Sequence, residues 1–332
     1  MQRGLRARLG IAIAAVALTA LGPVAATGDP EPKPGNWGRW GKDDERGAAN
    51  LITPERVVAA ARLVQKGKVI SLAIPLDAAG PVFPGRVPPL RLMAVSGADY
   101  AAGEKPAFGA PFHIADDYLF MPIQGSTQWD ALSHAWEGDT LYNGVPQTAV
   151  RGSGATRLGI QNVKDGLVGR GVLIDVLAYK GGSMAPGTAI TRADLDGALA
   201  RQGTKVGPGD IVLVRTGVVP AFYAIADPVA RTRFLVSPQS GLALDVAGWV
   251  QQRDVAAVAA DNLTLEVFPA KDGKTLHMPL LHRLGVYIGE IFWLEDLAAD
   301  CAADGRYEFF LAAQPLNLTR AVASPINPVA VK

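Results

Sequence analysis

The sequence has little of several residue types, and each scarcity excludes a class of site. Among 332 residues there are one cysteine, Cys301, and four histidines. A single thiol excludes internal disulfides, zinc ribbons and iron–sulfur clusters, which need two or more cysteines. The net charge of +1, from 32 basic and 31 acidic residues, gives no general attraction to nucleic acid or acidic membranes. Neither nucleic acid nor an acidic membrane is therefore expected as a partner.

Long apolar runs are also scarce, and one short run opens the chain. Three arginines precede an apolar stretch over 9–21, and small residues follow at 24–26. This stretch is shorter than the roughly 20 residues that cross a bilayer, so no stable membrane anchor is expected. The pattern predicts a signal peptide over 1–26 and an exported protein, periplasmic or secreted. We expect a disordered lead-in over 27–39 and a single catalytic domain over 40–328.

Glycine and proline, at 37 and 24 residues, are plentiful enough for many turns between short elements. Apolar runs bounded by turn residues predict strands over 69–74, 171–176, 211–215 and 255–259. Capping residues and apolar periodicity predict helices over 54–65, 191–201 and 244–252. The alternation indicates an α/β fold with a mixed or parallel sheet covered by helices. The segment 77–109 has little periodicity and is expected to be a long ordered loop near a binding site.

Common catalytic signatures are missing from the chain. There is no phosphate-binding P-loop, no dinucleotide fingerprint and no glycine-flanked nucleophile serine. Cys301 has no histidine near it in sequence, and we expect a buried, inert thiol on a helix.

One segment concentrates polar side chains of the kind that bind metal ions. In QGSTQWDALSH, the residues Gln124, Gln128, Asp130 and His134 have even spacing. If the run is extended, all four side chains fall on one face. Without further context, Asp130 could instead cap a helix or close a turn, and His134 could be a hydrogen-bonded core residue.

A second segment, HMPLLHRLGVYIGE, reads as a short helix, a glycine stop and a strand that ends in Glu290. His277 and His282 lie five residues apart, roughly 140° around a helix, so they cannot chelate one ion together. We expect at most one of them in the site and assign His282 a structural role. His113 is expected to make a loop contact.

These segments resemble the metal-dependent cyclase family that includes bacterial kynurenine formamidase and isatin hydrolase, whose signature is HxGTHxDxPxH. The segments WGKDDERGAANLITPE, GRGVLIDV and EDLA resemble the same family in the same order, so the resemblance spans about Trp40 to Pro328. It implies a swivelling β/β/α domain, a homodimer or homotetramer, and a one- or two-metal site. Thr127, Asp130 and His134 fall on matching positions. His134 would carry protons, and Asp130, His277 and Glu290 would hold the metal.

The chain departs from the family pattern at both early histidines, which are Gln124 and Gln128, and at the proline, which is Leu132. The gap from His277 to Glu290 is also one residue longer than the common pattern. Amide oxygens bind zinc more weakly than imidazoles do, so the exchange favours Mn²⁺, Mg²⁺ or Ca²⁺ in relative terms. We expect a divalent ion, Mn or Zn. The two glutamines assist as ligands or hydrogen-bond the substrate.

The resulting expectation is a hydrolase of a small cyclic amide, formamide or lactone, arylformamidase-like, acting on carbon–nitrogen bonds other than peptide bonds. A metal-bound hydroxide would attack, and His134 would move the proton. Alternatives are a metal-free binding protein and a polyketide-type cyclase or dehydratase. The candidate substrate-binding residues, for which core and turn roles remain open, are Trp129, Tyr142, Asn143, Phe83 and Asp261.

Overall fold

The computed structural model describes residues 35–104 and 112–332. The predicted signal peptide, 1–26, and residues 27–34 of the lead-in lie outside this part. Residues 35–39, expected to be disordered, are instead tied to the body of the protein. The Asn36 amide donates to the Arg283 carbonyl over 2.9 Å, and the Trp37 indole donates to the His282 carbonyl over 2.6 Å.

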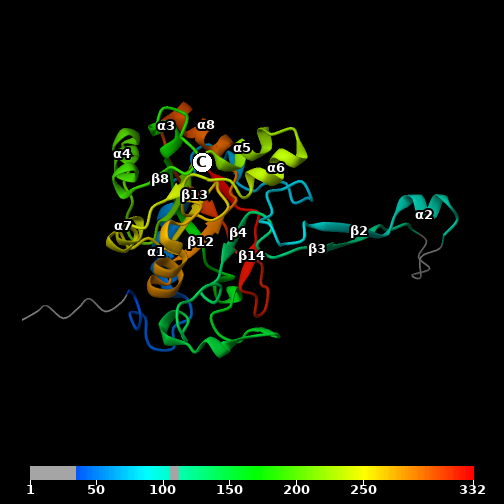
Figure 1. Cartoon of the computed structure of the whole chain (residues 1–332), viewed down its shortest axis with the longest axis horizontal. Coiled ribbons are helices and arrows are strands. Elements are labelled where there is room, and N and C mark those ends of the chain that lie inside the picture. Colours follow the sequence, from blue (N-terminus) through cyan, green and yellow to red (C-terminus); the bar gives the residue numbers. More distant parts are fainter. Residues whose placement is uncertain (1–34, 105–111) are drawn as a thin grey trace, which may run out of the picture. The chain divides into compact units, whose positions relative to one another are not determined.

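Within the described residues, nine strands form one mixed sheet in the order β1-β15-β13-β7-β9-β11-β12-β4-β14 (Figure 1). The four central strands run parallel: β7 (Val168–Asp175), β9 (Ile211–Arg215), β11 (Ala257–Ala260) and β12 (Tyr287–Glu290). The outer strands pair antiparallel: β1 (Val69–Ser71), β15 (Val329–Val331), β13 (Glu308–Ala312), β4 (Gln128–Asp130) and β14 (Ala323–Pro325). The predicted α/β class and mixed sheet are confirmed.

Helices flank this sheet. They are α1 (Pro54–Ala61), α3 (Val176–Tyr179), α4 (Arg192–Gln202), α5 (Val218–Ala224), α6 (Pro228–Phe234), α7 (Val246–Gln252), α8 (Glu295–Asp304) and a π-helix (Met278–Leu284). Thr53 caps α1 by accepting from the Arg56 amide, and Thr191 with Asp194 forms a capping box at α4. The caps explain why both predicted helix starts agree with the structure.

The segment 77–109 was expected to be a long ordered loop, and residues 105–109 of it lie outside the described residues. The described part, 77–104, instead includes regular secondary structure. It contains β2 (Leu90–Val95) and α2 (Gly97–Ala101), and β2 pairs with β3 (Asp116–Phe120) as an antiparallel hairpin. Two further strand pairs are β5 (Val150–Arg151) with β6 (Gly154–Ala155) and β8 (Ala189–Ile190) with β10 (Gly241–Leu242). Short 3-10 turns cover Gly47–Leu51, Tyr142–Gly144, Gln147–Ala149, Ile160–Val163 and Lys271–Gly273.

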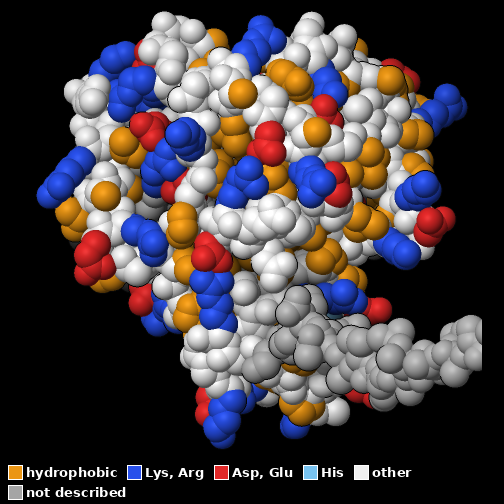
Figure 2. All heavy atoms as spheres, turned by 90° about the vertical axis from the view of Figure 1, so that its left-hand side faces the viewer, with side chains coloured by type: hydrophobic (Ala, Val, Ile, Leu, Met, Phe, Trp, Pro, Cys, Tyr) orange, Lys and Arg blue, Asp and Glu red, His pale blue; other side chains and the backbone are white. Residues whose placement is uncertain are grey.

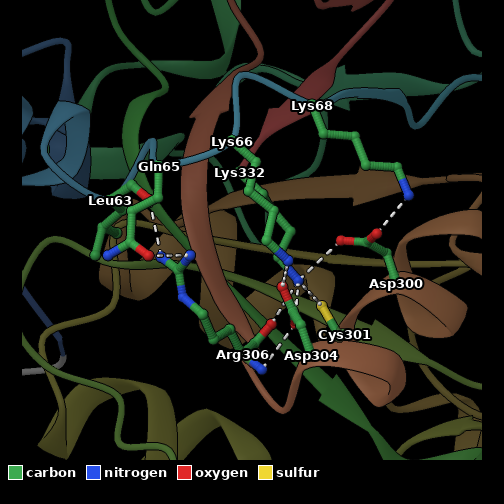
Figure 3. A network of polar contacts seen from close by, with 9 residues as sticks. All are labelled: Leu63, Gln65, Lys66, Lys68, Asp300, Cys301, Asp304, Arg306 and Lys332. Carbon is green, nitrogen blue, oxygen red and sulfur yellow. Dashed lines mark hydrogen bonds and ion pairs between the residues drawn. The ribbon is translucent and has the colours of Figure 1, made fainter.

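A buried lysine joins the end of β15 to α8 (Figure 3). The Lys332 side chain has no exposed surface, and its ammonium lies 3.0 Å from Asp300 and 2.8 Å from Asp304. It also donates to the Arg306 carbonyl over 2.9 Å and lies 3.5 Å from the Cys301 sulfur. A buried ammonium persists because carboxylates and a carbonyl replace the water that it has lost.

Cys301 is fully buried on α8, and burial raises the pKa of its thiol to about 11. The expected buried, unreactive thiol is therefore confirmed. On the face shown in Figure 2, basic and acidic side chains are interspersed. Among the described residues, no helix has both the length and the apolarity that crossing a membrane requires.

Candidate metal and catalytic site

The candidate site is built on two neighbouring strands, β4 and β12. In their antiparallel register, Gln128 lies opposite Glu290, and Asp130 lies opposite Ile288. Side chains alternate along a strand, so Gln128 and Asp130 share one face with Glu290. The Gln128 amide nitrogen donates to Glu290 Oε2 over 2.8 Å. Sheet pairing, which the sequence does not display, therefore brings the two motifs together.

Trp129 lies on the opposite face of β4, inside the core. It has no exposed surface, and its indole donates to the Ala313 carbonyl over 2.7 Å. The ring lies over Gly289, where an added Cβ would come within 2.6 Å of it. The prediction of Trp129 as a substrate-stacking residue is therefore wrong, since strand alternation turns it away from Gln128 and Asp130.

His277 lies immediately before the π-helix and faces three carboxylates. Its Nδ1 is 3.0 Å from Glu266 Oε2, and its Nε2 is 3.4 Å from Glu290 Oε1 and 3.8 Å from Asp130 Oδ2. The contact with Glu266 fixes the ring and turns Nε2 toward the other two carboxylates. This is the orientation of a metal-ligating histidine.

The longer gap between His277 and Glu290 coincides with that π-helix. A π-turn closes over one more residue than an α-turn, so it can take up one extra residue without moving the flanking strand. The helix ends at Gly285, whose φ of 64° lies in the left-handed region. The predicted glycine stop is confirmed.

Gln124 and His134 reach the site through turns rather than along an extended strand. Only residues 128–130 of their segment are in a strand, and the His134 amide bonds back to the Ala131 carbonyl. The Gln124 Nε2 to His134 Nδ1 distance is 3.3 Å, and His134 Nε2 lies 3.9 Å from Asp130 Oδ1. The four polar side chains therefore lie close together, as predicted. They do so through turns, and not because the whole segment is an extended strand with every second side chain on one face.

Asp130 is the unusual residue of the site. It is fully buried, yet neither carboxylate oxygen receives a hydrogen bond from any described residue, and Gln128 Oε1 likewise lacks a donor. Leaving buried polar oxygens without partners costs on the order of 1–3 kcal/mol each, more for a charge. Asp130, His134 and His277 can each point one ligand atom to a common position, since these atoms lie within 4.8 Å of one another.

The position where these three atoms converge fits a divalent cation, which carboxylate and imidazole donors can hold. Glu290 offers a second carboxylate beside it, since its Oε1 lies 3.4 Å from His277 Nε2. A cation would also be a partner for the two Asp130 oxygens, which no described residue hydrogen-bonds. Gln128 Oε1 is free to assist, because the Gln128 amide nitrogen is already bonded to Glu290.

Burial and the neighbouring charges set the protonation states. Burial raises the pKa of Asp130 to about 6, with the nearby Glu290 charge adding to the rise and both histidines opposing it. Burial lowers the pKa of His134, so its imidazole is neutral at neutral pH. Burial alone would also lower the pKa of His277, but Glu266 and Glu290 hold it well above the ordinary value. A bound cation would reverse this preference, because it favours a neutral imidazole and ionised carboxylates.

Two site residues were not predicted from the sequence. Glu266 contacts His277 across 11 residues, and no motif marks it. Arg86 donates to the Gln124 carbonyl over 2.9 Å. Burial is the largest cause of the lowered pKa of His134, and the positive charge of Arg86 lowers that pKa further. Arg86 lies in the proline-rich segment whose fold the sequence did not reveal, so only its position three residues after Phe83 could have drawn attention to it.

Four other candidate substrate residues have structural contacts elsewhere. Tyr142 is fully buried, with its hydroxyl 3.4 Å from Asp44 Oδ2, and the Asn143 amide donates to the carbonyls of Gly41, Lys42 and Asp44. Asp261 is fully buried and accepts from the Thr216 and Gly217 amides. Phe83 packs edge-on against Phe268.

The two remaining histidines also lie outside the cluster. Nitrogen atoms of the buried His282 side chain have no partner among the described residues, and its ring packs against Trp37. His113 stacks on Tyr100 at 4.1 Å. Neither is placed near Asp130 by any contact, in line with the structural and loop roles expected for them.

The chain is similar to several known proteins. A family model named Cyclase, described as "Putative cyclase", matches residues 70–267. A crystal structure described as a novel cyclase is 58% identical, with a TM-score of 0.87, over 90% of this chain and 100% of that chain. None of the curated proteins matches.

More distant structures share the fold. An isatin hydrolase bound to the product analogue thioisatinate is 17% identical, with a TM-score of 0.58, over 84% of this chain and 98% of that chain. Isatin hydrolase A from Labrenzia aggregata, bound to benzyl benzoate, is 16% identical, with a TM-score of 0.57, over 83% and 97%. Identities this low show a shared fold and do not transfer an activity.

Proposed function

The chain belongs to the Cyclase family, and from this premise we propose that it is a metal-dependent hydrolase of a small cyclic amide, formamide or lactone. The observation that carries the proposal is the fully buried Asp130, whose carboxylate oxygens have no hydrogen-bond donor among the described residues while two histidines face them. The isatin hydrolases, which act on a cyclic amide, share the fold and suggest the substrate class.

Asp130, His277 and Glu290 would hold the ion, with Gln128 assisting. When bound, a divalent cation supplies Lewis acidity toward a carbonyl and toward water. Glu266 accepts from His277 Nδ1 and so keeps the Nε2 lone pair directed at the ion. Each of these side chains comes from strand β4 or β12, which are paired with neighbours on both sides, or from the segments packed beside them, which favours a fixed geometry.

His134 would move the proton. It is neutral near pH 7, because burial lowers its pKa, and its Nε2 faces Asp130. With the Gln124 amide nitrogen donating to Nδ1, the ring proton lies on Nε2, and that nitrogen cannot take up another proton. A half-turn of the Gln124 amide presents its oxygen to the Nδ1 proton and leaves the Nε2 lone pair free to accept a proton. The imidazolium formed in this way returns the Nε2 proton to the leaving nitrogen or oxygen, so this one orientation of Gln124 serves both halves of an acid–base cycle.

One observation favours the metal-free alternative, a binding protein. Glu266 and Glu290 raise the pKa of His277, and an imidazolium there would offset part of the carboxylate charge without a metal. Even as an imidazolium, His277 keeps its Nε2 3.8 Å from Asp130 Oδ2, and His134 Nε2 is 3.9 Å from Asp130 Oδ1, so neither oxygen receives a hydrogen bond. We therefore favour the cation.

The test is a screen of cyclic amides, formamides and lactones with the protein stripped by chelator and then reloaded with Mn or Zn. We expect products whose combined mass is that of the substrate plus one water, formed only after metal is restored. A product lighter by one water would indicate a cyclase or dehydratase instead. Hydrolysis that persists in the stripped protein would overturn the metal-dependent mechanism.

We also propose that the protein acts after export, in the periplasm or outside the cell. The support is the arginine-led apolar segment and the small residues at 24–26. The amino-terminal sequence of the protein recovered from its host tests this, with a start near Thr27 expected and a start at residue 1 contradicting export.

A further inference from the structure

Arg86 is an exposed cation beside the site that has no anionic partner among the described residues. Its Nη1 donates to the Gln124 carbonyl over 2.9 Å, whereas Nε and Nη2 donate to no described residue. These two nitrogens form the fork with which an arginine holds both oxygens of one carboxylate through parallel hydrogen bonds. Within the described chain, the carboxylate-binding edge of Arg86 is therefore open to a ligand.

The segment 81–86, which ends in this arginine, is fixed on the side of His277. Its first two residues are buried, and the Phe83 ring packs edge-on against Phe268 with 5.9 Å between the ring centroids. Phe268 lies two residues after Glu266, whose carboxylate is 3.0 Å from His277 Nδ1. The aromatic pair therefore ties the segment to the part of the chain that orients His277.

Arg86 itself is fixed on the side of His134. The carbonyl that accepts from it belongs to Gln124, whose side-chain amide nitrogen lies 3.3 Å from His134 Nδ1. Burial is the largest cause of the pKa shifts of Asp130 and His134, and the Arg86 charge acts to lower both pKa values. The guanidinium is therefore close enough to act on the site, and along these contacts it lies beyond His134.

The charge of the site makes a cation at this place matter for substrate choice. Three carboxylates face His277, those of Asp130, Glu266 and Glu290. When both histidines are neutral, these carboxylates carry one negative charge more than a divalent ion neutralises. The remaining charge repels an anionic substrate unless a cation lies where the negative group of the substrate is bound. Arg86 supplies such a cation, and it is not one of the residues that would hold the ion.

We propose, resting on the hydrolase function proposed above, that Arg86 selects substrates that carry a carboxylate group, and that its Nε and Nη2 bind this group. The group is distinct from the scissile carbonyl, because Gln124 and His134 lie between Arg86 and Asp130. One fork with two donors matches the two oxygens of one carboxylate. Arg86 is thus a specificity residue, and it takes no part in holding the ion or moving the proton.

The test compares substrates that differ only in this group. They are 3- and 4-formamidobenzoate and the matching formamidobenzamides, in which a neutral amide replaces the carboxylate. The readout is kcat/KM for the acid divided by kcat/KM for its amide, in the metal-loaded protein. We expect a ratio of about 10 for the wild type, because water weakens an exposed ion pair, and of about 1 or less for Arg86→Gln. A substitution that only displaces Gln124 lowers both rates alike and leaves the ratio unchanged.

Two further variants serve as matched controls. Arg86→Lys keeps the charge but not the fork, so its ratio should lie between those of the wild type and Arg86→Gln. Arg201 is exposed on α4 and, like Arg86, donates through Nη1 to a single backbone carbonyl, that of Ala178 at 3.2 Å. Arg201→Gln should therefore keep the wild-type ratio. A wild-type ratio near 1, or a ratio that Arg86→Gln leaves unchanged, would overturn the proposal.

A binding measurement separates this proposal from the hydrolase function on which it rests. Calorimetric titration with 3- and 4-aminobenzoate and the matching aminobenzamides, the amines that hydrolysis of these formamides releases, needs no turnover. We expect the acids to bind the wild type about 10-fold more tightly than the amides, and Arg86→Gln to remove the difference.

This binding preference without hydrolysis of any formamide would count against the hydrolase function and support the carboxylate site. Acids that bind no more tightly than the amides would overturn the carboxylate site, whether or not the formamides are hydrolysed. A preference that persists in Arg86→Gln would also overturn it, since the carboxylate would then bind elsewhere, for example at the ion.

Discussion

Two buried charged clusters in this protein differ in one respect, and that difference separates structure from function. The Lys332 side chain is fully buried, and its ammonium group contacts Asp300, Asp304 and the Arg306 carbonyl (Figure 3). Asp130 is equally buried, but no described residue donates to either oxygen. A buried charge with partners stabilises the fold, whereas one without them indicates a ligand that the chain does not supply.

The largest predicted effect comes from Asp130→Asn. Loss of the bound ion removes several kcal/mol of transition-state stabilisation, so kcat/KM should fall by about 10³–10⁴-fold. In chelator-treated protein the same substitution should leave the melting temperature unchanged or raise it, because it removes an unpartnered buried charge. A clear loss of stability in the stripped variant would show that Asp130 is structural, like Lys332.

Replacing His134 by Gln tests proton transfer separately from metal binding. We expect kcat to fall by about 10²–10³-fold, within the range usual for a general acid–base residue. The metal content should remain that of the wild type. A variant that loses both metal and activity would place His134 among the ligands.

Glu266→Gln tests the residue that orients His277. The ring loses a charged acceptor at Nδ1, and substitution of such a partner commonly costs about 10–100-fold in metal affinity or activity. A metal titration of the stripped variant measures the affinity. Unchanged affinity would mean that Glu266 does not orient the ligand.

Lys332→Met tests the buried cluster in which the charged groups contact one another. Removing one partner of a buried pair typically costs about 3–5 kcal/mol, but Asp300 and Asp304 are 14 and 13% exposed and can regain water, so we expect about 2 kcal/mol. Denaturant unfolding measures the loss. The activity of the remaining folded enzyme should be unchanged, and a large fall in kcat would contradict the separation of the two clusters.

The smallest effect is a pH dependence of that same stabilisation. Burial alone would raise the pKa of Asp304, but the hydrogen bonds from Lys332 and the Arg306 amide outweigh it and lower the pKa to about 2. A carboxyl whose pKa is lowered on folding stabilises the protein above its unfolded value, near 4, and loses this as pH falls toward 2. The stability difference between wild type and Lys332→Met should shrink over that interval. A difference that grows on acidification would contradict the assignment.

The sequence predicted the elements whose signals are local. β9 matches its predicted bounds, and α4 begins at its predicted cap, since buried apolar runs and capping residues act within a few positions. The β2–β3 hairpin was missed because its strands are not buried and Pro88–Pro89 interrupts the pattern just before β2. An exposed hairpin lacks the burial from which sequence patterns are read.

The site was predicted in its residue types but not in its contacts. Motif resemblance identified Asp130, His134, His277 and Glu290, while the Gln128–Glu290 bond depends on a strand register that no spacing reveals. Trp129 was misplaced because it follows Gln128 directly, and adjacent strand residues point to opposite faces. Glu266 carries no motif and is identified only by its contact with His277.

The most direct test of the central claim is the metal content of the mature protein, purified without chelating resin and measured by elemental analysis. The comparison is with Asp130→Asn and with Asp261→Asn, a control at another fully buried aspartate whose oxygens are bonded to backbone amides. The account predicts about one Mn or Zn per chain in the wild type and in Asp261→Asn, and none in Asp130→Asn. A wild type that takes up no ion after incubation with each metal, or equal metal in Asp130→Asn, would contradict it.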